Sequence, residues 1–233
     1  ISIMKISFDE FYQELEEGVY DPNIFKAIFL AGGPGSGKSF VAGRTGIIGK
    51  GLKLVNSDNE FEFLMKQAQL SLDMTGKAAE KQSDKRDKIR DKAKSMTSKK
   101  KGGYIDGRLG LIIDGTARDY PKLAAEAVAL QKLGYDTYMI FVNTSLDVAL
   151  ERNAMRPRKV PESIVTKSWN AVQNNIGKFS LFFKKGFIIV DNNEVNEDIF
   201  KEVYKRVTYL LKQRVQNGRA KLWIQHQLDL KRR

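Results

Sequence analysis

The sequence predicts an α/β protein, a three-layer sandwich in which helices cover both faces of a five-stranded, mainly parallel sheet. Short apolar segments alternate along the chain with segments of helical periodicity, and this order is typical of parallel sheets. A glycine-rich stretch lies between the first apolar segment and the helical segment that follows it. The length of 233 residues suits one such domain together with an insertion.

The glycine-rich stretch GGPGSGKS, residues 32–39, matches the pattern G-x-x-x-x-G-K-[ST] at every fixed position. It follows a predicted strand at residues 27–31 and precedes a predicted helix, which is the context that this motif requires. Glycines allow successive backbone N–H groups to point at an anion, and a helix start adds its positive dipole end. We therefore expect a P-loop NTPase-type fold. The residues expected to bind the nucleotide are Gly32, Gly33, Pro34, Gly35, Ser36, Gly37, Lys38, Ser39 and Phe40.

Two side chains of this loop have specific predicted roles. Lys38 places a positive charge near the β- and γ-phosphates, and Ser39 offers a hydroxyl group to Mg²⁺. ATP and Mg²⁺ are therefore the expected cofactors. The alternative is a glycine-rich turn that binds no ligand, but strand, loop and helix follow one another in the order that phosphate binding requires.

The remaining elements are predicted from periodicity, capping residues and turn signals. A capping box at Ser7 and Glu10 predicts a helix that extends to about Glu17. Further strands are expected at residues 52–55, 109–114, 137–142 and 187–190. Helices are expected after Asp58, at residues 121–133 with Gly134 as C-cap, after Ser145, from Pro161 to Ile176, and after Asn196.

Together with the glycine-rich loop, these elements predict one P-loop domain at residues 1–218. It is expected to contain an insertion at about residues 71–103 and a lid at about residues 152–161. A basic tail covers residues 219–233, and three interpretations of it remain open: a docked helix, a partner-binding segment or a frayed end.

The segment at residues 77–101 is dense in Lys, Arg, Asp and Glu and has few large apolar side chains. We expect an exposed helix that ends in a flexible stretch at residues 99–103. Together with the net charge of +12, this basic helical insertion favours anionic partners. It is either a substrate-facing arm or a solvated insertion without a role.

The composition limits the chemistry. The chain has no cysteine, which excludes disulfides and thiolate metal sites, and the expected location is the cytoplasm. No apolar run approaches the ~18 residues of a membrane span, so no membrane partner is expected. The single histidine, His226, lies close to the C-terminus, and any general base is therefore expected to be a carboxylate.

Polar residues follow several of the predicted strands. Because ligands bind at the carboxyl ends of parallel strands, the side chains expected to converge there are Lys38, Asp58, Asp114 and Asn143. Asp58 is the candidate catalytic base, which would orient an acceptor hydroxyl and take its proton. The alternative is that Asp58 only caps the helix that follows it.

Asp114 ends an apolar strand, as a Walker-B-type carboxylate does, and could hold a Mg²⁺-bound water opposite Ser39. These two residues form the predicted metal site. An ordinary Asp-Gly turn is the alternative for Asp114. Thr116 and Arg118 follow within reach of the same cleft, and with Asp58 they are the residues expected to bind the acceptor.

A cluster of arginines is the second strong feature. Arg152 and Arg156 are four residues apart, so they share one helix face if the helix persists that far. Pro157 ends the helix, and the basic turn that follows resembles a lid carrying Arg156 and Arg158. Planar guanidinium groups suit the charge that spreads over a transferring phosphoryl group. A solvated basic helix end is the alternative.

The ordered motifs resemble the zeta-toxin and polynucleotide-kinase-like group of P-loop kinases over roughly residues 27–190. They are GGPGSGKS, Val-Asn-Ser-Asp before the second helix, Ile-Ile-Asp-Gly-Thr at the third strand, and Arg-x-x-x-Arg-x-x-x-Val-Pro. The resemblance implies an ATP-dependent kinase that transfers the γ-phosphate to a hydroxyl or phosphate acceptor. It implies Lys38, Asp58 and Arg156 as catalytic residues and places Arg152 near the nucleotide. The group includes many phage-encoded members.

The sequence departs from this group in two places. Polynucleotide 5′-kinases carry an arginine three residues after the catalytic aspartate, and this chain has Phe61 there. Zeta toxins lack so basic an insertion after the second strand. The acceptor identity therefore does not carry over: an anionic acceptor is expected, either nucleic acid or a nucleotide sugar, and a protein partner is unknown.

Two other functions remain open. The chain could be a P-loop NTPase, although it has no Asn-Lys-x-Asp motif for guanine. It could also be a nucleotide-dependent nucleic-acid-binding protein without kinase activity. The net charge supports the latter, but residues 77–101 lack the mixture of aromatic and basic residues typical of single-strand binding.

Overall fold

A computed structural model describes residues 18–232 of the chain, so the helix predicted from the capping box at Ser7 lies outside the described residues. The described part contains one five-stranded sheet, and all its strand pairings are parallel. The strands are β1 (Lys26–Ala31), β2 (Lys53–Val55), β3 (Leu111–Gly115), β4 (Asp136–Asn143) and β5 (Phe187–Asp191). Their spatial order is β2-β3-β1-β4-β5. The predicted fold class is confirmed.

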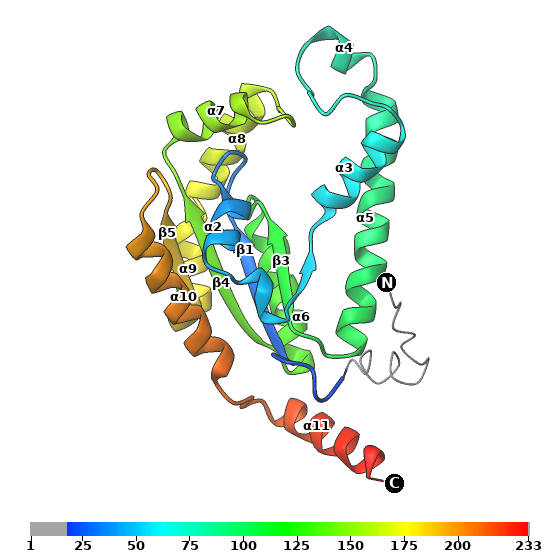
Figure 1. Cartoon of the computed structure of the whole chain (residues 1–233), viewed down its shortest axis with the longest axis vertical. Coiled ribbons are helices and arrows are strands. Elements are labelled where there is room, and N and C mark those ends of the chain that lie inside the picture. Colours follow the sequence, from blue (N-terminus) through cyan, green and yellow to red (C-terminus); the bar gives the residue numbers. More distant parts are fainter. Residues whose placement is uncertain (1–17, 233) are drawn as a thin grey trace, which may run out of the picture.

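Helices cover both faces of the sheet, as Figure 1 shows. The helices of this sandwich are α2 (Lys38–Arg44), α6 (Tyr120–Leu133), α7 (Leu146–Met155), α8 (Glu162–Gln173), α9 (Ile176–Phe183), α10 (Glu197–Lys212) and α11 (Gly218–Lys231), with the short 3₁₀ turns η1 (Ile48–Lys50) and η2 (Lys184–Gly186).

The central strand β1 divides its side chains between two apolar cores, because successive residues of a strand point to opposite faces. Phe29 belongs to the core that includes residues of α6, α8 and α9. Its neighbours Ile28 and Leu30 belong to the core that includes residues of α2 and α10. All six residues of β1 are buried, so this strand fixes the sheet between the two helical layers.

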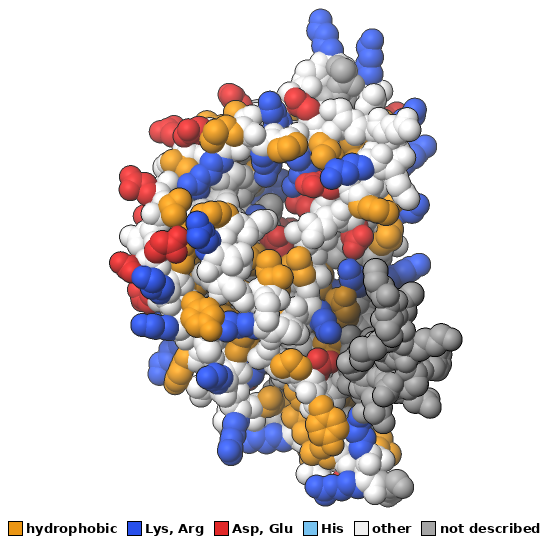
Figure 2. All heavy atoms as spheres, viewed as in Figure 1, with side chains coloured by type: hydrophobic (Ala, Val, Ile, Leu, Met, Phe, Trp, Pro, Cys, Tyr) orange, Lys and Arg blue, Asp and Glu red, His pale blue; other side chains and the backbone are white. Residues whose placement is uncertain are grey.

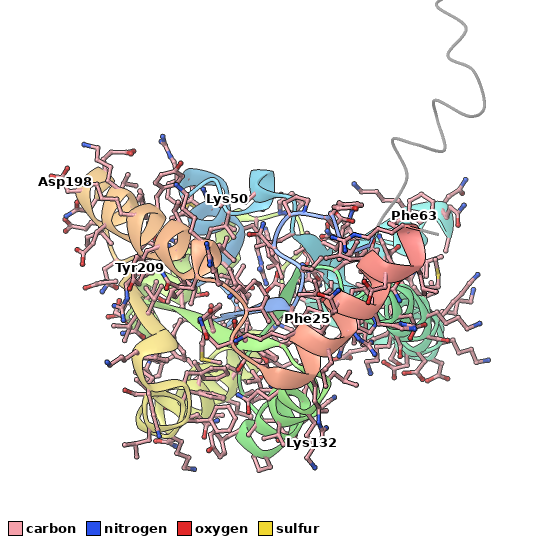
Figure 3. The ribbon with its side chains drawn as sticks, turned by 90° about the horizontal axis from the view of Figure 1, so that it is seen from below. Phe25, Lys50, Phe63, Lys132, Asp198 and Tyr209 are labelled. Atoms are coloured by element: carbon pink, nitrogen blue, oxygen red, sulfur yellow. The ribbon has the colours of Figure 1, made fainter. Side chains whose placement is uncertain are left out.

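The C-terminal tail forms the helix α11, which docks on the first core, so of the three interpretations that the sequence left open the frayed end is wrong. Ala220 of α11 is fully buried in the first core. The ring of Trp223 meets the ring of Phe25 edge to face, with the centroids 5.4 Å apart. Figure 3 shows α11 passing close to Phe25 at the amino-terminal end of β1.

Between β2 and β3 the chain forms a pair of long helices beside the sheet. They are α3 (Ser57–Gln67) and α5 (Ser83–Asp106), with the short α4 (Gly76–Glu80) before α5 (Figure 1). A separate small core joins them, in which Phe61 and Met65 of α3 pack against Ala93 of α5. The basic segment is therefore helical, as expected, but one side of it is packed against α3.

The expected flexible end of this helix at residues 99–103 is wrong, because α5 continues through both glycines to Asp106. Two contacts hold its last turns in place. Tyr104 and Ile105 pack against the first core. Lys101 forms an ion pair with Glu126 of α6.

The predicted helix from Pro161 to Ile176 is two helices, α8 and α9, which meet at Asn174 and Asn175. The side chain of Asn175 donates hydrogen bonds to the carbonyl groups of Ala117 and Arg118, at 3.2 and 3.0 Å. This contact fixes the break between the helices. Residues 176–183 were not predicted as a separate helix.

Across residues 18–232, no helix combines the length and the apolar character needed to cross a membrane.

Candidate active site

A cavity of about 800 Å³ lies at the carboxyl ends of the strands. Its walls come from the phosphate loop, the start of α3, the end of β3, the segment after α7, and α5. Figure 2 shows the hollow with Lys, Arg, Asp and Glu side chains around it. Seven cationic side chains and three carboxylates line it, so the cavity favours anionic ligands. The cations are Lys38, Arg90, Lys94, Arg118, Arg152, Arg156 and Arg158.

The phosphate loop needs glycine at two positions. Gly35 and Gly37 have φ angles of 80° and 83°, which side chains other than glycine rarely adopt. A Cβ atom on Gly35 would lie 2.1 Å from the carbonyl oxygen of Ala149 in α7. The loop is also supported from β5, because Asn192 Nδ2 donates a 2.8 Å hydrogen bond to the carbonyl oxygen of Ser36.

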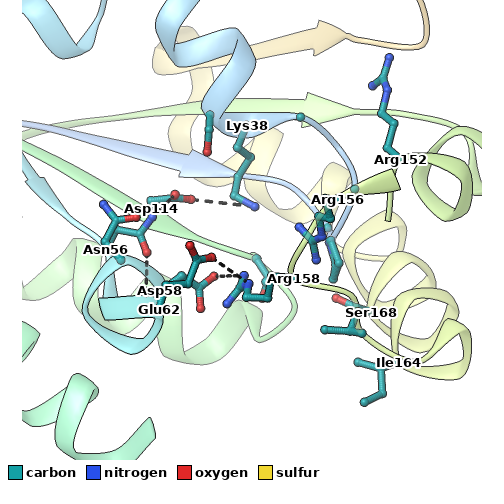
Figure 4. Close-up of a pocket in the computed structure, with 18 of the residues that line it drawn as sticks. Lys38, Asn56, Asp58, Glu62, Asp114, Arg152, Arg156, Arg158, Ile164 and Ser168 are labelled. Carbon is teal, nitrogen blue, oxygen red and sulfur yellow. Dashed lines mark hydrogen bonds and ion pairs between the residues drawn. The ribbon is translucent and has the colours of Figure 1, made fainter. Parts of the chain in front are cut away.

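Lys38 opens α2 and points into the cavity (Figure 4). Its Nζ donates a 2.9 Å hydrogen bond to the carbonyl oxygen of Gly32 and lies 3.9 Å from Oδ1 of Asp114. Burial lowers the pKa of Lys38, and the nearby carboxylates of Asp114 and Asp58 only partly offset this effect. The ammonium group is thus held with few partners at the position where phosphate would lie.

Asn56, and not Asp58, caps α3. The Oδ1 atom of Asn56 accepts a 2.7 Å hydrogen bond from the backbone N–H of Asp58, and the helix begins at Ser57. The side-chain Nδ2 of Asn56 donates a 2.7 Å hydrogen bond to Oδ2 of Asp114. Asn56 therefore connects the ends of β2 and β3, and the carboxylate of Asp58 faces the cavity instead of capping the helix.

Asp58 is surrounded by arginines. Nη2 of Arg158 donates a 2.7 Å hydrogen bond to its Oδ2, and Nη1 of Arg90 lies 3.8 Å from its Oδ1. Burial raises the pKa of Asp58, but the hydrogen bond from Arg158 and the charges of Arg158, Arg90 and Lys38 together hold this pKa below its usual value. Arg158 also contacts Glu62, with Nε 3.2 Å from Oε1 (Figure 4).

Asp114 and Ser39 fit a magnesium site. Oδ1 of Asp114 is buried and makes no hydrogen bond to any described residue, and burial raises the pKa of this carboxyl. Ser39 lines the same cavity. Mg²⁺ in nucleotide sites usually takes one or two protein oxygens together with water and substrate phosphates, and a carboxylate and a hydroxyl group at this place fit that pattern.

The predicted helical arrangement of Arg152 and Arg156 is not found in the structure. Helix α7 ends at Met155, and Arg156 has extended backbone angles, so Arg152 and Arg156 do not share a helix face. Arg152 instead donates hydrogen bonds to the carbonyl oxygens of Asn192 and Asn193, at 2.7 and 3.1 Å. Figure 4 shows Arg152 and Arg156 pointing in different directions, although both line the cavity.

The segment after α7 is shaped by Asn153. Its Nδ2 donates a 2.8 Å hydrogen bond to the carbonyl oxygen of Val160, and its Oδ1 accepts one from the Val160 N–H at 3.2 Å. Arg156 Nη2 also donates to Asn153 Oδ1, at 3.3 Å. This loop holds Arg156 and Arg158 over the cavity, and burial lowers the pKa of Arg156.

Of the other predicted site residues, Thr116, Arg118 and Phe40 line the same cavity. Asn143 does not. Its Oδ1 accepts a 2.7 Å hydrogen bond from Nε2 of Gln173, and the residue contributes to a different hollow, between β5 and α10. The expectation that Asn143 joins the site is therefore wrong, because α8 holds its side chain away from the cavity.

Several cavity residues were not predicted from the sequence. They include Asn56 and Glu62 of the α3 region, Arg90 and Lys94 of α5, and Ser168 of α8. The guanidinium carbon of Arg90 lies 4.0 Å from the ring centroid of Phe61. The spacing of Arg90 and Lys94 by four residues was the available signal, because such residues share a helix face.

Comparison with known families agrees with this architecture. A family model described as an AAA domain matches residues 28–178, from β1 to the third residue of α9. The chain belongs to this AAA domain family. The matched region includes the phosphate loop, Asp58, Asp114 and the loop after α7 that carries Arg156 and Arg158. No curated protein matches the chain.

Among solved structures, the AAA domain is similar to a protein of the PezAT chromosomal toxin–antitoxin system of Streptococcus pneumoniae. The identity is 16%, the match covers 91% of this chain and 100% of that chain, and the TM-score is 0.51. It is also similar to a structure of the AvrRxo1-ORF1:AvrRxo1-ORF2 complex with ATP, at 14% identity, with 89% and 73% of the two chains covered and a TM-score of 0.53. A gluconokinase from Sinorhizobium meliloti 1021 matches at 15% identity over 81% and 95% of the chains, with a TM-score of 0.48. The similarities to the PezAT and AvrRxo1 structures show a shared fold.

Proposed function

We propose that this AAA domain is an ATP-dependent kinase that transfers the γ-phosphate of ATP to a hydroxyl or phosphate group of a second, anionic substrate. One observation carries the proposal: the carboxylate of Asp58 lies in the same cavity as Lys38 and is not used as a helix cap. A protein that only bound a nucleotide would not need a carboxylate across the cavity from its phosphate loop. The ATP complex of one structural neighbour supports the choice of nucleotide.

The phosphate loop and the arginines would bind the nucleotide. Backbone N–H groups of the glycine-rich loop and the ammonium group of Lys38 bind its phosphates. Ser39 and Asp114 would hold Mg²⁺, directly or through water, and the ion neutralises charge on the β- and γ-phosphates. Arg152 lies beside Gly37 and contributes to the nucleotide side of the cavity.

Asp58 would act on the acceptor. It accepts a hydrogen bond from the acceptor hydroxyl, orients the oxygen toward the γ-phosphorus, and takes the proton as the new O–P bond forms and the bond to the β-phosphate oxygen breaks. ADP leaves with the electron pair of the broken bond. Arg156 and Arg158 stabilise the negative charge on the transferring phosphoryl oxygens.

This assignment requires Arg158 to serve two groups. Its guanidinium group bridges Asp58 and Glu62 on the α3 side and extends from the loop that carries Arg156. A planar guanidinium group has five N–H donors, so it can bind a phosphoryl oxygen while it keeps one carboxylate. Arg158 would thus connect the acceptor side with the transferring phosphate.

The test is transfer of labelled phosphate from [γ-³²P]ATP to a panel of acceptors. The panel contains nucleosides, nucleotides, nucleotide sugars, and DNA and RNA with 5′-hydroxyl ends. The proposal predicts a labelled acceptor that depends on Mg²⁺ and is absent with Asp58→Asn. Release of inorganic phosphate with no labelled acceptor would instead support a P-loop NTPase. Binding of nucleic acid that requires a nucleotide but leaves the nucleic acid unlabelled would support a nucleic-acid-binding protein without kinase activity.

A further inference from the structure

We propose that helix α5 binds the acceptor through Arg90 and Lys94, and that the acceptor is a small molecule that carries a phosphate group beside its reactive hydroxyl. The inference rests on the proposed kinase function. It goes further in assigning the recognition to two side chains of the inserted helix, and in naming the chemical class that they select.

Arg90 is positioned by an aromatic ring. Its guanidinium carbon lies 4.0 Å from the ring centroid of Phe61, and Phe61 itself is only 1% exposed. The guanidinium group therefore lies on a rigid apolar surface at the wall of the cavity. Its Nη1 is 3.8 Å from Oδ1 of Asp58, which is within an ion pair but beyond a hydrogen bond.

Arg90 also retains its hydrogen-bonding capacity. Among the residues that the structure describes, it makes contacts with Asp58 and Phe61 but donates no hydrogen bond. Its side chain is about one-third exposed, at 34%, and it lines the cavity. The N–H donors of this arginine can therefore all be directed at a ligand.

Lys94 lies one helical turn after Arg90, on the same face of α5, and lines the same cavity. Its Nζ is 3.5 Å from Oδ1 of Asp91, and its side chain is largely exposed. Arg90 and Lys94 are the basic residues of α5 that line the cavity among the described residues, and Lys100 and Lys101 near the end of the helix contact Glu60 and Glu126 instead. The positive charge that α5 offers to the cavity is thus concentrated in Arg90 and Lys94.

These two groups suit a phosphate. The carboxylates on this side of the cavity are Asp58 and Glu62, and Arg158 already contacts both. Arg158 and Arg90 together balance these two carboxylates, and the cavity as a whole has seven cationic side chains against three carboxylates, so a net positive charge remains for an anionic ligand. A guanidinium group held flat and a mobile ammonium group are the usual ligands of phosphate oxygens. Because the reactive hydroxyl must lie at Asp58, the phosphate and the hydroxyl belong to one acceptor.

The shape of the cavity favours a small acceptor over a nucleic acid strand. The backbone N–H of Met74, in the segment before α4, donates a 2.9 Å hydrogen bond to the carbonyl oxygen of Lys159. This bond joins the α3–α5 wall to the loop that carries Arg158, and it bounds the acceptor side of the cavity. The volume of about 800 Å³ lies within the range of about 300–1,000 Å³ for small-molecule sites.

The experiment measures acceptor binding without turnover. The full chain, with Mg²⁺ and the non-hydrolysable analogue AMP-PNP, is titrated by calorimetry with UMP, UDP-glucose and glucose 6-phosphate. Uridine and glucose serve as the counterparts without phosphate, and a 5′-hydroxyl oligonucleotide represents nucleic acid. We expect at least one phosphorylated compound to bind more tightly than its counterpart.

The variants locate this binding. Arg90→Gln should weaken the binding of the phosphorylated compound by roughly 10–100-fold. This is the range expected when hydrogen bonds to a charged group are lost. Lys94→Gln should weaken it less, because its ammonium group is mobile. Lys88→Gln and Lys92→Gln, at exposed positions of the same helix, are the matched controls and should bind as the wild type does. The affinity for AMP-PNP and the thermal unfolding of each variant show whether the cavity is intact.

The outcomes separate this inference from the kinase proposal. Equal binding of every phosphorylated compound and its counterpart, or a loss in Arg90→Gln no larger than in Lys92→Gln, would overturn the inference. Arg90-dependent binding of the oligonucleotide alone would overturn the assignment to small molecules. Arg90-dependent binding of a phosphorylated compound that never becomes labelled would contradict the kinase proposal and support the phosphate site.

Discussion

Arg158 donates a 2.7 Å hydrogen bond from Nη2 to Oδ2 of Asp58, which joins the loop after α7 to the start of α3. This contact affects the chemistry of the carboxylate. Burial alone would raise the pKa of Asp58, but Arg158 and the other nearby cations hold this pKa below its usual value. Asp58 is therefore ionised at neutral pH, as a proton acceptor must be.

Arg158→Gln should move the acid limb of the pH–rate profile to higher pH. The substitution removes the hydrogen bond and the positive charge, while the burial that raises the pKa of Asp58 remains. The proton therefore binds Asp58 at a higher pH, and kcat begins to fall earlier as pH decreases. Profiles of kcat from about pH 4 to pH 8 test this, with Lys159→Gln as the neighbouring control. An unchanged acid limb would mean that Asp58 does not control the rate.

Lys38→Ala should abolish phosphoryl transfer while the fold persists. Among residues 18–232, the polar partners of its ammonium group are the loop carbonyl of Gly32 and the carboxylate of Asp114, so the role expected for Lys38 is binding of ligand phosphates. ATP turnover and the far-ultraviolet circular dichroism spectrum are measured on the same preparation. Full turnover with a native spectrum would contradict the assignment of the phosphate loop.

Arg156→Ala should reduce kcat more than Arg152→Ala does. Arg156 lines the cavity from the loop after α7, whereas Arg152 is bound to the carbonyl groups of Asn192 and Asn193. Asn192 in turn supports the phosphate loop at Ser36. Arg152→Ala should therefore raise the KM for ATP and lower thermal stability. An arginine that stabilises the transferring group can contribute about 10³–10⁵-fold to kcat. Small and equal effects of the two substitutions would show that neither arginine stabilises the transferring phosphoryl group.

Gly35→Ala should destabilise the fold by about 2–4 kcal/mol, from the strained backbone and the overlap with α7. The added Cβ atom would lie 2.1 Å from the carbonyl oxygen of Ala149, at a φ angle of 80°. Gly49→Ala is the matched control, because a Cβ atom there meets nothing within 4 Å and φ is not positive. Thermal unfolding should separate the variants by about 5–10 °C. Equal melting temperatures would show that the phosphate loop adjusts freely.

Local signals made much of this fold predictable. The phosphate loop, the capping residues Ser145 and Asn196, and the C-cap at Gly134 depend on residues close in sequence, and the structure has each of them. The strands were identified because buried parallel strands are continuous apolar runs. The order of these signals was enough to predict a parallel sheet with the polar strand ends on one edge.

Tertiary contacts account for what the sequence did not reveal. Asn56 takes the capping role because its side chain also reaches Asp114 across the sheet, a contact between residues 58 positions apart. Arg90 enters the cavity only because α5 packs on α3, and the apolar stripe that packs there is narrow and includes Ala93. Asn143 leaves the site because Gln173 of α8 binds it. None of these pairings has a local sequence pattern.

The most direct test of the account is the effect of Asp58→Asn on kcat, measured with the affinity for AMP-PNP and with thermal unfolding. Asparagine preserves the size of the side chain but cannot take the proton, so kcat should fall by about 10²–10⁴-fold. AMP-PNP binding should be retained, since the mechanism that we propose assigns Asp58 to the acceptor and not to the nucleotide. Glu62→Gln, which alters the other carboxylate partner of Arg158, should keep most of the activity. If Asp58→Asn transfers phosphate at the wild-type rate, Asp58 is not the catalytic base and the proposed mechanism is wrong.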